Sequence, residues 1–166
     1  MVDIKINTSD VKGGFDKACT ELEDLLFERV KIAGEHLKAK TVEEAPSDEG
    51  GLRASIFSRA SRKKGELKAV VGSNLEYAPY VHQGTGIYAK GGNGRKGYWV
   101  FVKGSNGRKG KKSKKSYTLD EAKKIMAILR KKGFEAYYTC GQKPNPFLLR
   151  AKEKGLGDIK RLLGVD

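Results

Sequence analysis

The side chains that most often ligate metals or act as nucleophiles are few in this chain and stand far apart. They are His36, His82, Cys19 and Cys140. A structural zinc site needs four Cys or His ligands in close pairs. Cys19 falls beside the apolar stripe of a helical pattern, where a buried and unreactive thiol is the usual outcome. The sequence therefore predicts no metal site, no catalytic residue and no cofactor.

A glycine-rich segment from Gly84 to Ala89 has the spacing of a dinucleotide-binding fingerprint. That fingerprint functions only where it follows a strand and opens a helix. Here the next residues are Lys90-Gly91-Gly92-Asn93-Gly94, a run that cannot form a helix. We therefore do not expect a nucleotide site.

The remaining candidate chemistry is electrostatic. Residues 77–119 contain ten Lys or Arg and no Asp or Glu, whereas the rest of the chain holds 24 basic and 20 acidic residues. Within this region, residues 103–116 are nearly all Lys, Arg, Gly and Ser, and two interpretations of this tract stay open: a solvated loop that is too charged to be buried, or non-specific contact with DNA. Five phosphate contacts would weaken binding about 500-fold between 50 and 200 mM salt. The candidate DNA-contacting residues are Arg95, Lys96, Lys103, Arg108, Lys109, Lys111, Lys112, Lys114 and Lys115.

The elements that must position these residues begin with one long helix. Apolar residues recur at steps of three and four over residues 10–44, which draws a single stripe along a helix. Pro46 is expected to end it. At 1.5 Å per residue the helix spans roughly 50 Å, more than one face of a small domain needs. Either a neighbouring subunit buries part of the stripe, or the stripe covers the chain's own sheet.

Residues 52–86 are predicted to form two strands, 53–60 and 66–73, followed by a compact bend that includes Gly-Thr-Gly. In the second strand, Leu67, Ala69 and Val71 alternate with Lys68 and Val70, so one face of that strand is expected to be buried. Because Pro79 cannot donate a ladder hydrogen bond, Tyr77–Gly86 is not expected to be a strand.

Residues 87–137 are predicted to form a basic β-α-β insert. A capping box, Thr118 to Glu121, opens its helix, and the two flanking strands are 98–103 and 134–138.

Residues 141–163 form a C-terminal segment and a helix with Pro146 at its first position, which Gly155 and Gly157 are expected to interrupt. The sequence thus predicts a single α+β domain over residues 1–166. Its mostly antiparallel sheet is packed by the long N-terminal helix and a C-terminal helix.

Three separated stretches carry the remaining information. They are Ala45-Pro46-Ser47-Asp48-Glu49-Gly50-Gly51-Leu52-Arg53-Ala54-Ser55-Ile56, Tyr77-Ala78-Pro79-Tyr80-Val81-His82-Gln83-Gly84-Thr85-Gly86, and Gly141-Gln142-Lys143-Pro144-Asn145-Pro146-Phe147-Leu148-Leu149-Arg150-Ala151. In this order and after a long amphipathic helix, they resemble the bacteriophage HK-ninety-seven gene-ten-like family of tail components. The candidate fold or interface residues are Pro46, Leu52, Arg53, Tyr77, Ala78, Gly84, Thr85, Gly86, Pro144, Pro146 and Phe147.

The resemblance implies a structural protein of the phage or prophage virion rather than an enzyme. It implies a tail-completion or head–tail joining component, assembled as a homo-oligomeric ring around the DNA channel, with tail-tube and head-connector proteins as partners. We expect the protein in the virion, and in the cytoplasm of the bacterial host during assembly. The competing class is a small basic nucleic-acid-binding module that is not part of a virion. Apolar runs are far shorter than the roughly 20 residues that cross a bilayer, so no membrane association is expected.

Overall fold

The computed structural model describes residues 8–48, 50–63, 65–92, 94–103 and 115–165. The fold is α+β, as predicted. The sequence was interpreted as one domain, and the structure divides the chain into two compact units. Unit 1 comprises Met1–Asn74 and Phe147–Asp166, and unit 2 comprises Leu75–Pro146.

The long helix of unit 1, α1, runs from Thr8 to Glu44 and is 37 residues long. The prediction of a helix over residues 10–44 is confirmed, with a start two residues earlier. The backbone N–H of Ala45 still donates to Thr41 O at 2.9 Å. Pro46 follows directly, and the helix ends because the residue before a proline is disfavoured in the α region.

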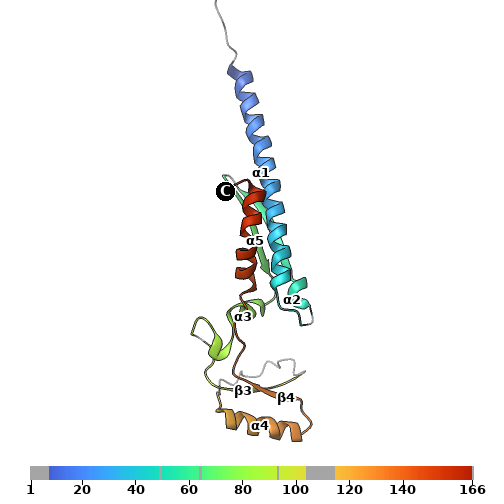
Figure 1. The fold of residues 1–166 in the computed structure, drawn as a ribbon, viewed down its shortest axis with the longest axis vertical. Coiled ribbons are helices and arrows are strands. Elements are labelled where there is room, and N and C mark those ends of the chain that lie inside the picture. Colours follow the sequence, from blue (N-terminus) through green and yellow to red (C-terminus); the bar gives the residue numbers. More distant parts are fainter. Residues whose placement is uncertain (1–7, 49, 64, 93, 104–114, 166) are drawn as a thin grey trace, which may run out of the picture. The chain divides into compact units, whose positions relative to one another are not determined.

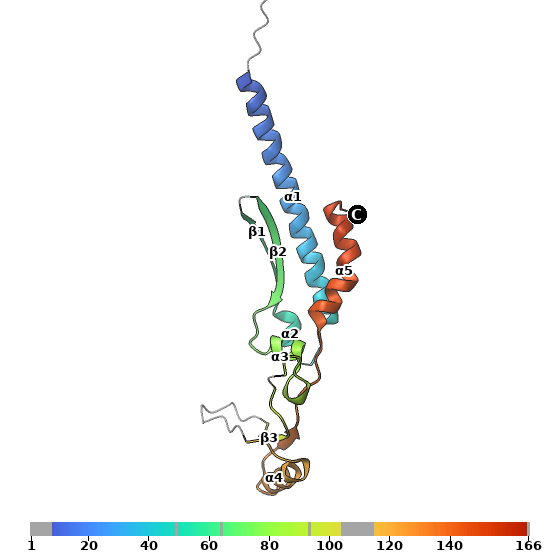
Figure 2. The same cartoon turned by 90° about the vertical axis from the view of Figure 1, so that its left-hand side faces the viewer.

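A β-hairpin packs along α1. β1 (Ile56–Lys63) pairs antiparallel with β2 (Glu66–Ser73), from Ile56 opposite Ser73 to Lys63 opposite Glu66. Figure 2 shows the two strands running beside the lower half of α1. The predicted strand 53–60 begins too early, because the short helix α2 (Gly51–Ala54) occupies its first residues. The alternation of β2 was predicted correctly: Leu67, Ala69 and Val71 are half-buried, whereas Lys68 and Val70 are exposed.

The close approach of the hairpin to α1 depends on Gly34. A Cβ atom there would lie 2.8 Å from Ser58 Oγ and 2.9 Å from Ala69 Cβ. Real Cβ contacts are essentially never that short, so any larger side chain would push the hairpin away from the helix. Glycine costs about 1 kcal/mol in a helix, and here that cost is offset by packing.

The second helix of unit 1, α5 (Phe147–Leu163), lies on α1 beside the hairpin (Figures 1 and 2). The helix begins at Phe147, one residue after Pro146. The expectation that Gly155 and Gly157 interrupt it is wrong, because the helix continues through both. Gly155 is buried, and a Cβ there would make ordinary contacts near 3.8 Å with Lys40 and Ile159.

Unit 2 holds the shorter elements. α3 (Ala78–Gln83) and the 3₁₀ turn η1 (Gly86–Tyr88) form the predicted compact bend. The insert then follows as β3 (Trp99–Val102), α4 (Leu119–Lys131) and β4 (Ala136–Thr139). β3 and β4 pair antiparallel, so the handedness rule for parallel crossovers does not apply. The described strands form two separate two-stranded sheets, β1–β2 and β3–β4.

Candidate functional site

The Gly-Thr-Gly segment is held by the third sequence stretch through backbone hydrogen bonds. The N–H of Thr85 donates to Gln142 O at 2.9 Å, and the N–H of Ile87 donates to Cys140 O at 3.0 Å. In return, the N–H of Gln142 donates to the Thr85 hydroxyl at 2.9 Å. We call these paired segments, residues 84–87 and 140–142, the clasp. The clasp joins two stretches that are more than fifty residues apart in sequence.

Glycine is required in the clasp for two physical reasons. Gly84 and Gly86 have φ of 78° and 61°, in the left-handed region that L side chains rarely adopt. A Cβ on Gly84 would also lie 2.9 Å from three backbone atoms, one of which is Gln142 O. A Cβ on Gly86 would collide with the carbonyl oxygen of Cys140. The spacing that suggested a phosphate loop is therefore used to bring two backbone segments together.

The first sequence stretch belongs to the core of unit 1. Leu52 is buried, and Pro46 is half-buried. The Nε of Arg53 donates to Ala45 O at 2.9 Å and so holds the turn that follows α1. Phe147, from the third stretch, is 1% exposed and is among the largest fully buried side chains described.

An ion-pair cluster fixes α5 against the end of α1. The Nε of Arg150 donates to Glu44 Oε2 at 2.8 Å, and Lys154 Nζ contacts Glu44 Oε1. Hydrogen bonds from Arg150 and Lys154 hold the pKa of Glu44 below its ordinary value.

Two further groups have shifted pKa values. An electrostatic interaction with Cys140 and a hydrogen bond with Cys140 raise the pKa of Tyr88. The backbone N–H of Thr118, which donates to Glu121 at 2.9 Å in the capping box, lowers the pKa of Glu121. Both shifts arise from local structure, and neither gives a pair of groups with the roles of acid and base.

The other candidate fold or interface residues divide by exposure. Ala78 is buried and Tyr77 is exposed, whereas Pro144 and Pro146 are half-buried. The carbonyl of Tyr77 accepts the N–H groups of Tyr80 and Val81 at 3.0 and 3.1 Å, which starts α3.

The candidate DNA-contacting residues that the structure describes differ in their surroundings. Arg95 lies over the ring of Trp99, 5.1 Å from its centroid, and donates to the carbonyl of Lys115. Lys103 Nζ is 3.9 Å from Glu135 Oε2, and Lys96 is exposed. Arg95 is thus a packing residue as well as a charge. Five other candidates lie outside the described residues: Arg108, Lys109, Lys111, Lys112 and Lys114.

The sequence did not single out the aromatic face of the β3–β4 sheet. Trp99 pairs with Thr139 and Phe101 with Tyr137, so these four side chains share one face of the sheet. The rings of Phe101 and Tyr137 stack with centroids 5.8 Å apart, and the guanidinium of Arg130 lies 5.4 Å from the Tyr137 centroid. The alternation of aromatic residues in β3 was the available signal. The strand that pairs with β3 could be identified only from the structure.

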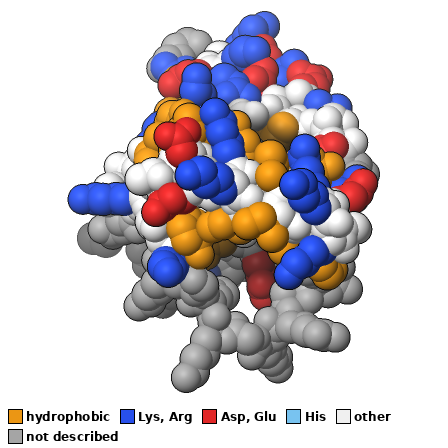
Figure 3. Space-filling model, turned by 90° about the horizontal axis from the view of Figure 1, so that it is seen from below, with side chains coloured by type: hydrophobic (Ala, Val, Ile, Leu, Met, Phe, Trp, Pro, Cys, Tyr) orange, Lys and Arg blue, Asp and Glu red, His pale blue; other side chains and the backbone are white. Residues whose placement is uncertain are grey.

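Charge is concentrated in the same unit. Unit 2 contains 16 Lys or Arg and four Asp or Glu, which gives +12 of the chain's +14. Figure 3, seen from below, shows blue Lys and Arg side chains spread among orange apolar ones. Unit 2 therefore combines a high positive charge with exposed aromatic side chains.

Neither a metal site nor a membrane span is found among the residues that the structure describes. No three His, Cys, Asp or Glu side chains there group in a way that could hold a metal ion. Within the same part of the chain, no helix has the length and hydropathy that a bilayer crossing requires.

The chain is similar to a known protein family. The model of a protein family described as "Bacteriophage HK97-gp10, putative tail-component" matches residues 10–102, more than half of the chain. These residues include α1, the hairpin and the Gly-Thr-Gly segment, but not the third stretch, 141–151. No curated protein and no solved structure matches the chain.

Proposed function

Because the chain belongs to the HK97-gp10 family of bacteriophage tail components, we propose that it is a tail-completion or head–tail joining protein. In this proposal several copies assemble as a ring around the channel through which DNA passes. The partners are other copies of the chain, the tail-tube protein and the head-connector protein. The protein is made in the bacterial cytoplasm and remains in the virion.

The difference in charge between the two units is the observation that supports a position of the protein beside DNA. Unit 2 holds +12 in 72 residues, whereas unit 1 is close to neutral. DNA carries one negative charge per about 1.7 Å of helix axis, so a ring of copies with unit 2 facing the channel would attract it strongly. Lys96 and Lys103 are the described residues that we assign to this contact.

The work of the protein is assembly rather than catalysis. The sequence stretches that define the resemblance are used in packing: Leu52 and Phe147 fill the core of unit 1, and Gly84 and Gly86 permit the clasp. Assembly energy would come from apolar area buried between copies, in interfaces above about 1,000 Å².

The test is to disrupt the gene in a phage that carries it and to examine the particles by electron microscopy. We expect filled heads and separate tails that fail to join, and normal particles when the gene is supplied in trans. Mass spectrometry of purified wild-type particles should detect the protein. Normal joining in its absence, or particles that lack the protein, would refute the proposal.

One observation favours a second candidate function, that of a nucleic-acid-binding module outside the virion. The aromatic face of β3–β4 lies in the most basic part of the chain, and stacked aromatic side chains bind single-stranded nucleic acid. Tight binding to single-stranded DNA together with absence from purified particles would support this candidate against the first.

A further inference from the structure

The exposed half of α1 carries an apolar strip. Phe15, Ala18, Leu22, Leu25 and Ile32 follow one another at steps of three and four, with Arg29 at the one remaining position. Phe15 is 68% exposed, Leu22 57%, Leu25 65% and Ile32 52%. We call these five residues the seam. Alternating steps of three and four are the spacing by which one helix packs along another.

The seam is distinct from the side of α1 that packs on the hairpin. Val30, Gly34 and Leu37 lie on that other side, where Gly34 approaches Ser58 and Ala69. At 100° per residue, the two sides are about a third of a turn apart around the helix axis.

α5 covers the seam side of α1 only in the C-terminal half of α1. His36 contacts Asp158 at 3.2 Å, and the Arg29 guanidinium lies against Gly164 at the end of α5. α5 has 17 residues and α1 has 37. Figures 1 and 2 show α1 continuing well beyond α5 and beyond the tip of the hairpin. From Phe15 to Leu25, the seam therefore extends an existing helix–helix contact into a region where no described element of the unit covers it.

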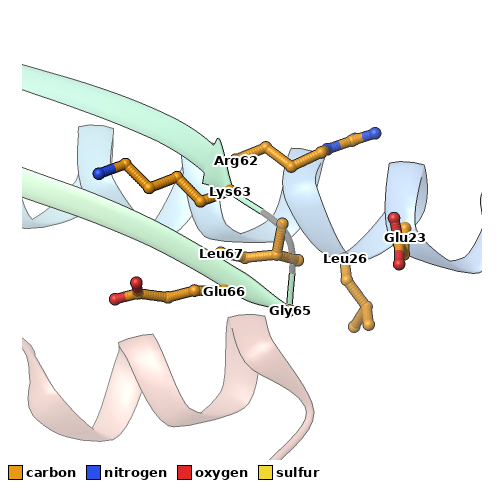
Figure 4. A pocket seen from close by; sticks show the side chains of 7 residues that line it. All are labelled: Glu23, Leu26, Arg62, Lys63, Gly65, Glu66 and Leu67. Atoms are coloured by element: carbon orange, nitrogen blue, oxygen red, sulfur yellow. The ribbon is translucent and has the colours of Figure 1, made fainter.

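A hollow lies beside the seam, between α1 and the tip of the hairpin. It has a volume of about 460 Å³ and is lined by Glu23, Leu26, Arg62, Lys63, Gly65, Glu66 and Leu67. In Figure 4, Leu26 extends from α1 beside the hairpin turn, and Leu67 lies at the start of β2. Charged side chains of both signs surround these two leucines, the arrangement of an apolar centre with a polar rim.

The hollow has a defined shape because its wall is held in place. Arg62 Nη1 pairs with Asp24 Oδ1 at 2.7 Å, and its guanidinium lies 4.8 Å from the centroid of the Phe27 ring. These contacts tie the tip of the hairpin to α1. The hollow can therefore receive a partner without first ordering its own wall.

The exposed area is sufficient for a specific interface. A buried Phe contributes about 150–250 Å², and a Leu or Ile about 100 Å² at 25 cal/mol per Å². Four such side chains, each more than half exposed, present about 300 Å² of apolar area. A comparable area on the partner's hollow, together with the polar rim around both surfaces, brings the interface toward about 1,000 Å². That area is at the lower end for specific association, so we expect weak binding that depends on concentration.

We propose that the seam of one copy packs into the hollow of a second copy of this chain, with the two α1 helices side by side. Every copy carries both surfaces, and they lie on different sides of α1. The contact is therefore heterologous, and each added copy leaves one seam and one hollow free. Such a contact closes into a ring where its rotation permits. The inference rests on the proposed ring and assigns the surfaces that form it.

The test uses the full chain in sedimentation velocity experiments at increasing concentration. Two variants disrupt the two surfaces separately: Leu25→Glu in the seam, and Leu26→Glu in the hollow. Thr20→Glu is the matched control, because it adds the same charge to the same exposed helix on the side opposite the seam. Circular dichroism establishes that all variants keep the helix content of the wild type.

The wild type and Thr20→Glu should form larger species as concentration rises. Each disrupted variant should stay monomeric, with an apparent Kd raised about tenfold or more. An equimolar mixture of the two disrupted variants should form dimers and nothing larger, because one intact seam meets one intact hollow. Leu26→Glu alone separates this contact from seam-to-seam pairing, because a seam that paired with another seam would leave that variant fully associating.

A wild type that remains monomeric, or a control that is as impaired as the seam variant, would overturn the inference. So would a Leu26→Glu variant that associates like the wild type. None of these results bears on whether the protein is present in particles, which tests the proposed function separately.

Discussion

Unit 1 and unit 2 differ in what stabilises them and in what they offer to partners. Unit 1 has two helices and a hairpin that share a core, and its 18 basic and 16 acidic residues nearly cancel. Unit 2 depends on backbone contacts between glycine-containing segments and carries +12. The proposals follow this difference: association between copies is proposed for the apolar surface of α1, and DNA contact is proposed for the basic unit 2.

The largest expected effect is the loss of stability when a side chain is removed from the core of unit 1 rather than from its surface. Phe147→Ala should destabilise unit 1 by about 4 kcal/mol, because a fully buried aromatic ring leaves a cavity. Leu149→Ala, on the exposed side of the same helix, should cost less than about 1 kcal/mol. Urea denaturation followed by circular dichroism measures both. Equal costs for the two variants would show that α5 packs differently.

The next effect concerns the clasp of unit 2. Gly86→Ala should cost about 3 kcal/mol, because it combines a strained backbone conformation with a collision against the carbonyl of Cys140. Gly91→Ala is the control, since a Cβ there meets nothing within 4 Å. Amide hydrogen exchange should show lost protection at Thr85, Ile87 and Gln142. If protection is lost in α1 and the hairpin instead, the clasp does not stabilise unit 2 specifically.

The assignment of DNA contact to unit 2 is tested by salt dependence. Lys96→Ala with Lys103→Ala should weaken binding to duplex DNA and reduce the slope of log K against log salt by about 2. Lys152→Ala with Lys160→Ala removes the same charge from unit 1 and should leave the slope nearly unchanged. Fluorescence anisotropy at several salt concentrations gives both slopes. A larger effect from the unit 1 pair would reverse the assignment.

The smallest effect is the pH dependence of the contact between α1 and α5. The pKa of Glu44 is lowered in the folded chain, so its ion pairs stabilise unit 1 above the unfolded pKa of about 4.3. That stabilisation is lost as the pH falls through the folded pKa. Urea midpoints of the wild type and Glu44→Gln should therefore differ at pH 6 and converge in stronger acid. A gap that stays constant with pH would show that the Glu44 charge is not responsible.

Much of the local structure was predictable because short-range patterns determine it. The period of α1, the stop at Pro46, the alternation of β2 and the capping box at Thr118 are all confirmed. Errors arose where a distant segment changed the outcome. The helix α5 continues through Gly155 because the side chains of Leu37 and Lys40 pack against that position, and neither is near it in sequence.

The candidate site was predictable only in part, because some of its contacts join segments that are far apart in the sequence. The absence of Asp and Glu from residues 77–119 identified the basic region. It did not predict the stacking of Arg95 on Trp99, or the face that Phe101 and Tyr137 share. Five of the basic candidates lie outside the described residues, so their contact with DNA stays a prediction.

The sequence alone determined the helix and strand types, the location of charge and the resemblance to a tail-component family, because each depends on residue type and short spacing. Only the tertiary structure showed that the Gly-Thr-Gly segment and residues 140–142 hold each other, and that α5 leaves half of α1 uncovered. Those results depend on pairings between segments far apart in the chain. Such pairings are set by the shape of the packed units, which no local pattern encodes.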